Sequence, residues 1–219
     1  MACRYTINGA VAGFGPLIVS TFGYTPLESI LLQFPLGTLC FISILVSGYL
    51  STRFKNVMIP ILLLNTGPVI AGCITIWKSS WEPPRPVGPV IGYTLIGTFG
   101  AVVSQIIVLG MSNVAGQTKK SIMAAAIFVA YCVGNIVGPQ LIKSETKAQH
   151  YPELWTGLII CYCITVAATL ALWFVMWKEN RTRDAHAQRA GQSYNDDERD
   201  KLAFQDLTDK QNPYFRYVW

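Results

Sequence analysis

The chain of 219 residues is 52% hydrophobic and only 13% charged, with a formal net charge of +5. Soluble domains average about 25% charged residues, so this composition disfavours a soluble domain and favours a membrane protein. Residues 1–178 hold 10 basic and 4 acidic side chains, whereas the last 41 residues hold 7 and 8. Because no basic run exceeds two residues, the sequence predicts no nucleic-acid partner.

Four apolar stretches contain no Asp, Glu, Lys, Arg or His, and each is at least 21 residues long. They span residues 57–77, 87–118, 121–142 and 154–177. A helix needs about 20 apolar residues to cross a bilayer, while the strands of a membrane barrel are shorter and alternate apolar and polar residues. The stretches therefore predict an all-α, multi-pass membrane protein embedded in the lipid bilayer.

Two further apolar segments precede these stretches, which predicts six transmembrane helices. The first, at residues 7–22, contains Gly9-x-x-x-Gly13, a spacing that lets another helix approach closely. The second starts at Pro26, with Thr25 as its N-cap, and runs to about residue 50. The remaining four helices are expected at about 57–77, 90–115, 121–142 and 152–178.

Basic side chains gather at one end of the predicted bundle. Six crossings place both termini on one side, together with tight basic loops at 48–56 and 116–120. That side holds eight basic residues against four on the other, which predicts cytoplasmic termini. We expect the bundle at 1–178 and a mostly disordered cytoplasmic tail at 179–219. Because the glycosylation sequon at Asn180 would then face the cytoplasm, we expect it to carry no sugar.

No arrangement of side chains predicts catalysis. The two histidines, His150 and His186, lie in a predicted loop and in the tail, and no G-x-S-x-G motif or phosphate-binding loop occurs. The six cysteines lack the spacing of metal ligands and are expected to be small packing residues. The sequence therefore predicts neither an enzyme nor a bound metal or cofactor.

Neutral polar side chains inside the predicted helices are the candidates for function. Polar groups within a membrane are costly unless they face a partner helix or a water-filled cavity. A hydrogen bond between helices is the commoner role, and the alternative is a path for a solute. Asn135 is the best single candidate because it lies mid-helix beside Tyr131. The candidates for the path are Asn135, Gln105, Tyr131, Tyr93, Asn8 and Gln33.

The stretch G-Y-L-S-T-R-F-K-N, which begins at Gly48, resembles a loop of the major facilitator superfamily with the pattern G-x-x-x-D-R-x-G-R. Gly48 and Arg53 match the pattern, Lys55 approximates its basic end, and Thr52 replaces the usual Asp. The stretch lies between two predicted helices, as that loop does. These residues are the candidate cytoplasmic loop motif.

Other stretches resemble the fungal allantoate permease family, the anion:cation symporters within that superfamily. They are G-F-G-P-L-I at 13–18, G-Y-T-P-L-E at 23–28, N-V-A-G-Q-T-K-K at 113–120 and G-N-I-V-G-P-Q at 134–140. The sequence D-L-T-D-K-Q-N-P-Y-F-R-Y at 206–217 is similar to the C-terminal signature of that family. The resemblance covers nearly the whole chain after residue 6.

The resemblance implies that the chain is the C-terminal six-helix half of a twelve-helix transporter, with its first helix beginning upstream. It also implies import of a small organic anion, such as allantoate, nicotinate or pantothenate, together with protons, across the fungal plasma membrane. The predicted helices lack charged residues near their centres, so groups for proton coupling would lie in the missing half. A second hypothesis is a non-transporting half-bundle that pairs with another chain or with itself.

Overall fold

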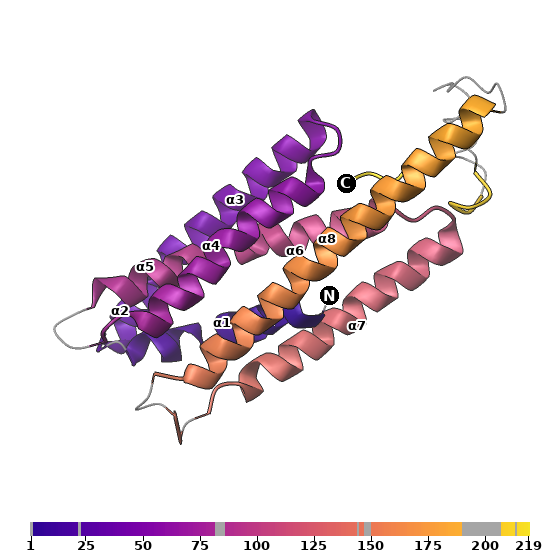
Figure 1. The fold of residues 1–219 in the computed structure, drawn as a ribbon. Coiled ribbons are helices and arrows are strands. Elements are labelled where there is room, and N and C mark those ends of the chain that lie inside the picture. The colour runs from indigo at the N-terminus through magenta and orange to yellow at the C-terminus, as the bar shows by residue number, and fades with distance from the viewer. Residues whose placement is uncertain are drawn as a thin grey trace.

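The computed structural model describes residues 2–21, 23–81, 86–143, 145–146, 150–189, 207–212 and 214–219, and all regular elements in these ranges are helical. The helices are α1 (Ala2–Ser20), α2 (Pro26–Leu31), α3 (Gln33–Arg53), α4 (Met58–Lys78), α5 (Val87–Ile96), α6 (Phe99–Ser112), α7 (Gln117–Gln140) and α8 (Pro152–Arg189). They form an elongated bundle, with α3, α4, α7 and α8 along its length (Figure 1).

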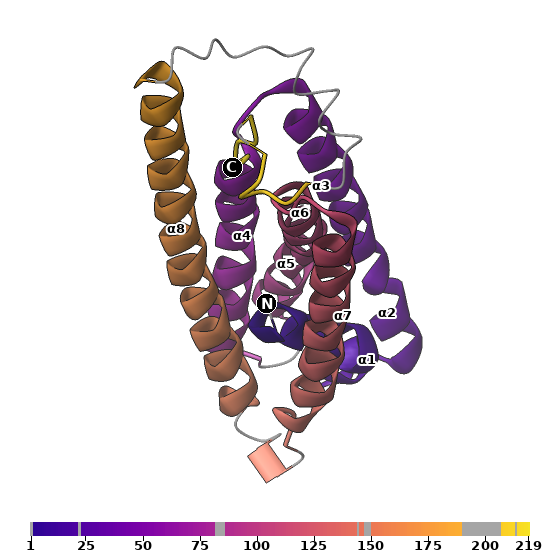
Figure 2. The same ribbon diagram turned by 90° about the vertical axis from the view of Figure 1, so that its right-hand side faces the viewer.

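Five helical stretches in the described part are long and apolar enough to cross a membrane. They are Pro26–Arg53, Met58–Lys78, Val87–Ser112, Gln117–Gln140 and Pro152–Arg189. The prediction of an all-α, multi-pass membrane protein is therefore confirmed. α1 is not one of the five candidate spans, which leaves one fewer than predicted. Its N-terminal end lies partway along the bundle, and the helix runs from there toward α2 (Figures 1 and 2).

Glycines bring α1 into close contact with α7. A Cβ atom on Gly9 would lie 2.7 Å from the Cα atom of Asn135, and one on Gly138 would collide with the carbonyl oxygen of Thr6. Real side chains do not tolerate such distances, so these positions require glycine. The close approach predicted at Gly9 is confirmed, and the partner helix is α7.

Two predicted helices are each divided by a short break. The second becomes α2 and α3, which meet at Leu32, and the fourth becomes α5 and α6, which meet at 97–98. The N–H of Gly97 bonds to the carbonyl oxygen of Thr94, so the helix tightens there before α6 begins. A Cβ atom on Gly97 would lie 2.5 Å from the carbonyl oxygen of Leu36, so the break lets α3 pack directly against the backbone.

The N-cap predicted at Thr25 is confirmed as a capping box. The Thr25 hydroxyl accepts a hydrogen bond from the N–H of Glu28, and the Glu28 carboxylate accepts one from the N–H of Thr25. Pro26 occupies the first position of the helix, where its missing N–H costs nothing.

Both predicted basic loops are shorter than expected because helices extend into them. α3 continues to Arg53, and the turn that follows contains Asn56 with a φ of 60°. α7 begins at Gln117 and so includes Lys119 and Lys120 in its first turns. A helix end outside the bilayer can hold polar residues, so apolar content alone misplaced these boundaries.

The last helix also runs beyond its predicted end, through Arg189. The ion pair between Glu179 and Arg183, one helical turn apart, lies on this polar extension. The disorder expected from residue 179 is therefore wrong for 179–189. Residues 190–206 of the predicted tail lie outside the described residues.

Burial is unequal among the spanning helices. In the most apolar part of α4, 44% of the residues are buried, and the same share is buried in the span formed by α5 and α6. The buried share is only 11% in the span that ends with α3 and 17% in α7. α4 and α5 meet at paired glycines, because a Cβ atom on Gly72 would lie 2.5 Å from the carbonyl oxygen of Gly92. The long apolar faces of α3 and α7 are left to face lipid or another protein.

Candidate functional site

Asn135, the leading candidate for a solute path, bonds to α1. Its Oδ1 atom accepts a hydrogen bond of 2.9 Å from Nδ2 of Asn8, and its own Nδ2 donates one of 2.8 Å to the carbonyl oxygen of Tyr131. The Tyr131 ring packs edge-on against Tyr5 of α1 at 5.2 Å and is 41% exposed, while Phe128 is 65% exposed. The structure thus brings Asn8, Tyr131 and Asn135 together at the α1–α7 contact, beside an exposed aromatic face.

Two other candidates, Gln33 and Tyr93, form a second and separate pair. The Tyr93 hydroxyl donates a hydrogen bond of 2.8 Å to Oε1 of Gln33, which joins α5 to α3. Gly15 of α1 covers this pair, because a Cβ atom there would collide with the Tyr93 hydroxyl. Tyr93 is 1% exposed and Gln33 is half-buried, so the hydrogen bond lies at the edge of the core. These contacts join three helices at one polar point.

Gln105 lies at a third place, near the end of α3. Its Oε1 atom accepts a hydrogen bond from the Ser51 hydroxyl at 3.2 Å, and its Nε2 atom lies 3.0 Å from the same hydroxyl oxygen. The contact joins α6 to α3, and Gln105 is buried. The six candidates therefore form three interhelical contacts rather than one lining, and their part in a solute path stays a prediction.

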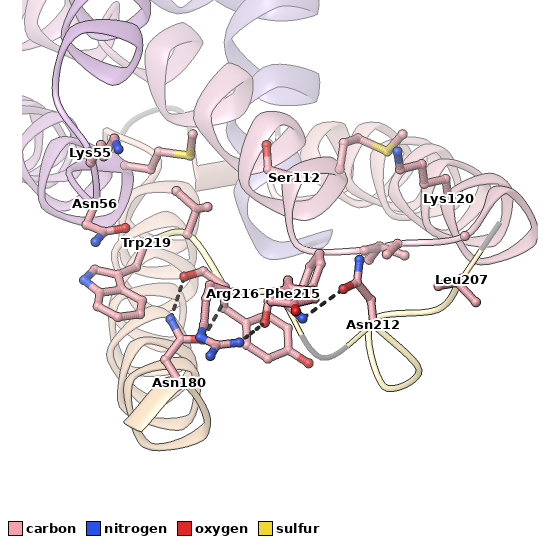
Figure 3. Close-up of a pocket in the computed structure, with 18 of the residues that line it drawn as sticks. Lys55, Asn56, Ser112, Lys120, Asn180, Leu207, Asn212, Phe215, Arg216 and Trp219 are labelled. Carbon is pink, nitrogen blue, oxygen red and sulfur yellow. Dashed lines mark hydrogen bonds between the residues drawn. The ribbon is translucent and has the colours of Figure 1, made fainter. Parts of the chain in front are cut away.

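A large cavity lies where the polar ends of several helices meet the C-terminus, and we call it the terminal cavity (Figure 3). Its volume is about 1110 Å³. Lys55 and Asn56, from the turn between α3 and α4, lie at one side, and Lys120 of α7 lies at another. Of the predicted loop motif, Lys55 lines this cavity, Arg53 ends α3, and Gly48 lies within α3 on an open face.

The C-terminal segment, residues 207–212 and 214–219, folds back onto this end of the bundle (Figure 1). Asn180 of α8 donates a hydrogen bond of 2.8 Å to the carbonyl oxygen of Tyr217 and accepts one of 2.9 Å from its N–H. Asn113, which follows α6, makes the same two hydrogen bonds with Val218, both of 2.8 Å. Each asparagine thus binds the N–H and the C=O of one residue, as a neighbouring β-strand would.

Charged side chains fix the other part of the C-terminal segment. Lys119 forms an ion pair with Asp209, whose carboxylate also accepts a hydrogen bond from the Tyr217 hydroxyl. Burial disfavours ionisation of Asp209, but the hydrogen bonds from Lys119 and Tyr217 outweigh it and lower the pKa of its carboxyl. Desolvation, together with the Asp209 carboxylate, raises the pKa of Tyr217.

The sequence predicts a mostly disordered tail and does not identify the partners of the C-terminal segment. Asn113 begins one of the stretches that resemble the permease family, and Asn180 belongs to a sequon, but neither pattern indicates a contact with the C-terminus. The spacing of these residues, 105 and 37 positions from their partners, gives no local signal. One sequence feature could have indicated docking of the C-terminal segment. Its last residues are rich in aromatic side chains, which is unusual for a disordered tail.

An apolar groove of about 380 Å³ lies between α4, α6, α7 and α8. Cys3, near the start of α1, borders it together with Leu62, Ile106 and Met123. Tyr217 of the C-terminal segment also contributes to its lining. It is lined mainly by side chains that suit lipid or another helix.

Comparisons with known proteins show similarity to transporters. An uncharacterized transporter of Schizosaccharomyces pombe is 36% identical over 97% of this chain and 40% of its own length. The allantoate permease of Saccharomyces cerevisiae is 28% identical over 96% of this chain and 39% of its own length. An MFS-type transporter of Penicillium expansum is 30% identical over 96% of this chain and 42% of its own length.

The chain spans about 40% of the length of the curated relatives that it matches. No family model matches the chain. No solved structure matches it significantly. Along almost its full length, the chain is thus similar to part of larger transporters of the major facilitator type.

Proposed function

We propose that this chain is the C-terminal part of a membrane transporter of the major facilitator superfamily. One observation carries the proposal: almost the whole chain is similar to a part of proteins named as transporters, and that part makes up about 40% of the length of each. The five candidate spans and the apolar faces of α3 and α7 suit a unit that packs against further helices. In the complete protein, solute would bind between this unit and an upstream half.

The proposed substrate is a small organic anion, taken up with protons. The allantoate permease of Saccharomyces cerevisiae is among the relatives, which supports this class of solute. In the described spans, charged side chains lie toward the helix ends, so this unit would offer the anion neutral contacts. The exposed side of the α1–α7 contact, with Tyr131 and Asn135, is the proposed contact surface, and ionisable groups would come from the upstream half.

The proposed location is the plasma membrane, with the C-terminal segment on the cytoplasmic side. The described ends of α3 and α8 and the start of α7 lie at the same end of the bundle, and they carry Arg53, Arg181 and Lys119. Basic residues favour the cytoplasmic side of a membrane. The terminal cavity would then open toward the cytoplasm.

Uptake by a permease-deficient yeast strain tests the transport proposal. By the longer protein we mean the complete transporter of which this chain would be the C-terminal part. We expect the longer protein to import a labelled anion such as allantoate, and to do so faster at low external pH. We expect this chain alone to insert into membranes without importing the anion. Longer protein that reaches the membrane yet imports none of a panel of organic anions would contradict the proposed substrate class. Substitution of Asn135 by Ala should raise the KM of the longer protein, whereas the exposed Val133→Ala should not.

A second candidate is a half-bundle that pairs with another copy and does not transport. The poorly buried α3 and α7 favour some partner surface, because their exposed side chains include Phe34, Phe41 and Phe128. Crosslinking of this chain in membranes distinguishes the two functions. A dimer without uptake supports the half-bundle, and restored uptake on co-expression of an upstream half supports the transporter.

A further inference from the structure

We propose that the C-terminal segment is a reversible strap, held along its main chain by Asn113 and Asn180, which closes over the terminal cavity and releases while the helix bundle stays folded. The segment joins the loop after α6 to the end of α8, two elements far apart in the sequence. Figure 3 shows its residues Asn212, Phe215 and Trp219 along the cavity, with Trp219 beside Asn56 of the opposite turn.

Recognition of the strap combines main-chain and side-chain contacts. The two asparagines bind the N–H and C=O groups of Tyr217 and Val218, and such contacts would hold almost any peptide in this position. Specificity comes from charged pairs, in which Arg216 binds Asp184 at 2.8 Å and Lys119 binds Asp209. The site therefore takes a peptide with one acidic and one basic residue at a set spacing, and this chain supplies it.

The contacts of the strap are those of a surface that can separate. Except for Asn212, its described side chains keep some solvent exposure, and the cavity of about 1110 Å³ remains between the strap and the helix ends. Each ion pair has one solvated member, because the Asp184 side chain is 59% exposed and that of Lys119 is 43% exposed, while their partners Arg216 and Asp209 are 20% and 13% exposed. Arg183 also donates hydrogen bonds to the main-chain carbonyl oxygens of Asp209 and Phe215. Docking therefore depends chiefly on main-chain contacts with the two asparagines and Arg183, and the partly solvated ion pairs add a smaller contribution.

Release of the strap has a consequence that rests on the proposed function. A transporter that alternates between two states must change the packing at this end of the bundle. The docked strap connects α8 to the junction of α6 and α7, and so restrains those helices relative to each other. The released strap removes the restraint and opens the terminal cavity to solvent.

Hydrogen exchange of the full chain in lipid nanodiscs tests the strap without any transport assay. We expect the amides of Tyr217 and Val218 to exchange more slowly than in a free peptide of residues 207–219, and faster than those of α4. Asn180→Ala should accelerate them about tenfold, since two hydrogen bonds are lost. Val218→Pro removes the N–H that donates to Asn113 and changes no residue of the helices. It should therefore accelerate exchange at Tyr217. Gln188→Ala, an exposed amide on the same cavity, is the matched control.

Exchange at the rate of α4 would overturn the proposal, because the strap would then be a fixed part of the core. Exchange at the free-peptide rate, or at a rate unchanged by Asn180→Ala and Val218→Pro, would overturn it equally. Accelerated exchange throughout the helices of the Asn180→Ala protein would show that the residue supports the bundle instead.

Crosslinking in the longer protein tests the restraint. With Lys119→Cys and Asp209→Cys joined by a short, reducible bis-methanethiosulfonate, we expect uptake to fall at least about tenfold and a reductant to restore it. The two single-cysteine proteins treated in the same way are the controls. Equal uptake with and without the link would overturn the restraint. If the unlinked protein imports nothing, the proposed function fails, and the exchange result still decides whether the strap exists.

Discussion

Asn8 donates a 2.9 Å hydrogen bond to Asn135 and so connects α1 to α7 through two side-chain amides. Asn135 also donates to the carbonyl oxygen of Tyr131 in its own helix, which leaves neither end of its amide without a protein contact. Of the two roles considered for membrane amides, this geometry supports the bond between helices. A solute could reach Asn135 only beside Tyr131, on the exposed face of α7.

Substitution of either asparagine should loosen the α1–α7 contact. We expect Asn8→Ala and Asn135→Ala each to lower the free energy of unfolding by about 1 kcal/mol, with the double variant losing less than the sum, since the two share one hydrogen bond. Thermal unfolding in mild detergent measures this, with Val133→Ala on the exposed face of α7 as the control. Strictly additive losses would show that the bond contributes nothing.

The glycine contact between α4 and α5 should not accept a methyl group. Gly72→Ala should destabilise the bundle by about 1–3 kcal/mol, because the new Cβ atom would lie 2.5 Å from the carbonyl oxygen of Gly92. Gly67, on the same helix, has no atom within 4 Å of such a position. Gly67→Ala should therefore be neutral or stabilise by up to about 1 kcal/mol. Equal effects of the two substitutions in the unfolding assay would contradict the observed packing.

Docking of the C-terminal segment should be stable between two pH limits. The pKa of Asp209 is lowered, so its contribution is complete above its ordinary value of 3.8 and is lost as pH falls through the docked value. The pKa of Tyr217 is raised, so its contribution is complete below its ordinary value of 10.0 and is lost as pH rises through the docked value. The fluorescence anisotropy of a dye attached after Trp219 should therefore be constant at intermediate pH.

The acidic transition has a specific control. Lys119 and Arg183 are the basic side chains that contact Asp209 and Tyr217. Asp209→Asn should weaken docking at neutral pH and abolish the transition at low pH. A midpoint near pH 6–7 would contradict this assignment and direct attention to a histidine.

Asn180 should carry no sugar although its sequence is a sequon. Both ends of its amide bind the main chain of Tyr217, and the proposed topology places it in the cytoplasm. Mass spectrometry of native membranes before and after glycosidase treatment should detect the unmodified peptide. A glycan on Asn180 would contradict both the cytoplasmic position of the C-terminal segment and the docked strap.

Sequence periodicity and composition located the spanning helices but not their interruptions. The α4 boundaries, Met58–Lys78, lie within one residue of the prediction, because the apolar run there ends at charged residues. The break at 97–98 had no such signal. It depends on the close approach of Leu36 to Gly97, a contact between helices that only the folded chain makes.

The polar contacts were predictable in kind but not in partner. Amides in membrane helices were expected to bond to each other, yet nothing in the sequence pairs Asn8 with Asn135, which are 127 positions apart. The same limit applies at the C-terminus, where Asn113 and Asn180 come together only because α6 and α8 end at the same end of the bundle. Helix packing determines which distant residues form hydrogen bonds, and local sequence patterns do not predict those partners.

The measurement that tests the central claim most directly is the size of the native protein, by blotting source membranes with an antibody to residues 207–219. The chain has a mass of 24.2 kDa and spans 40% of a transporter to which it is similar. Dividing 24.2 kDa by that share predicts a band at about 60 kDa. A single band near 24 kDa would contradict the claim that the chain is part of a larger transporter.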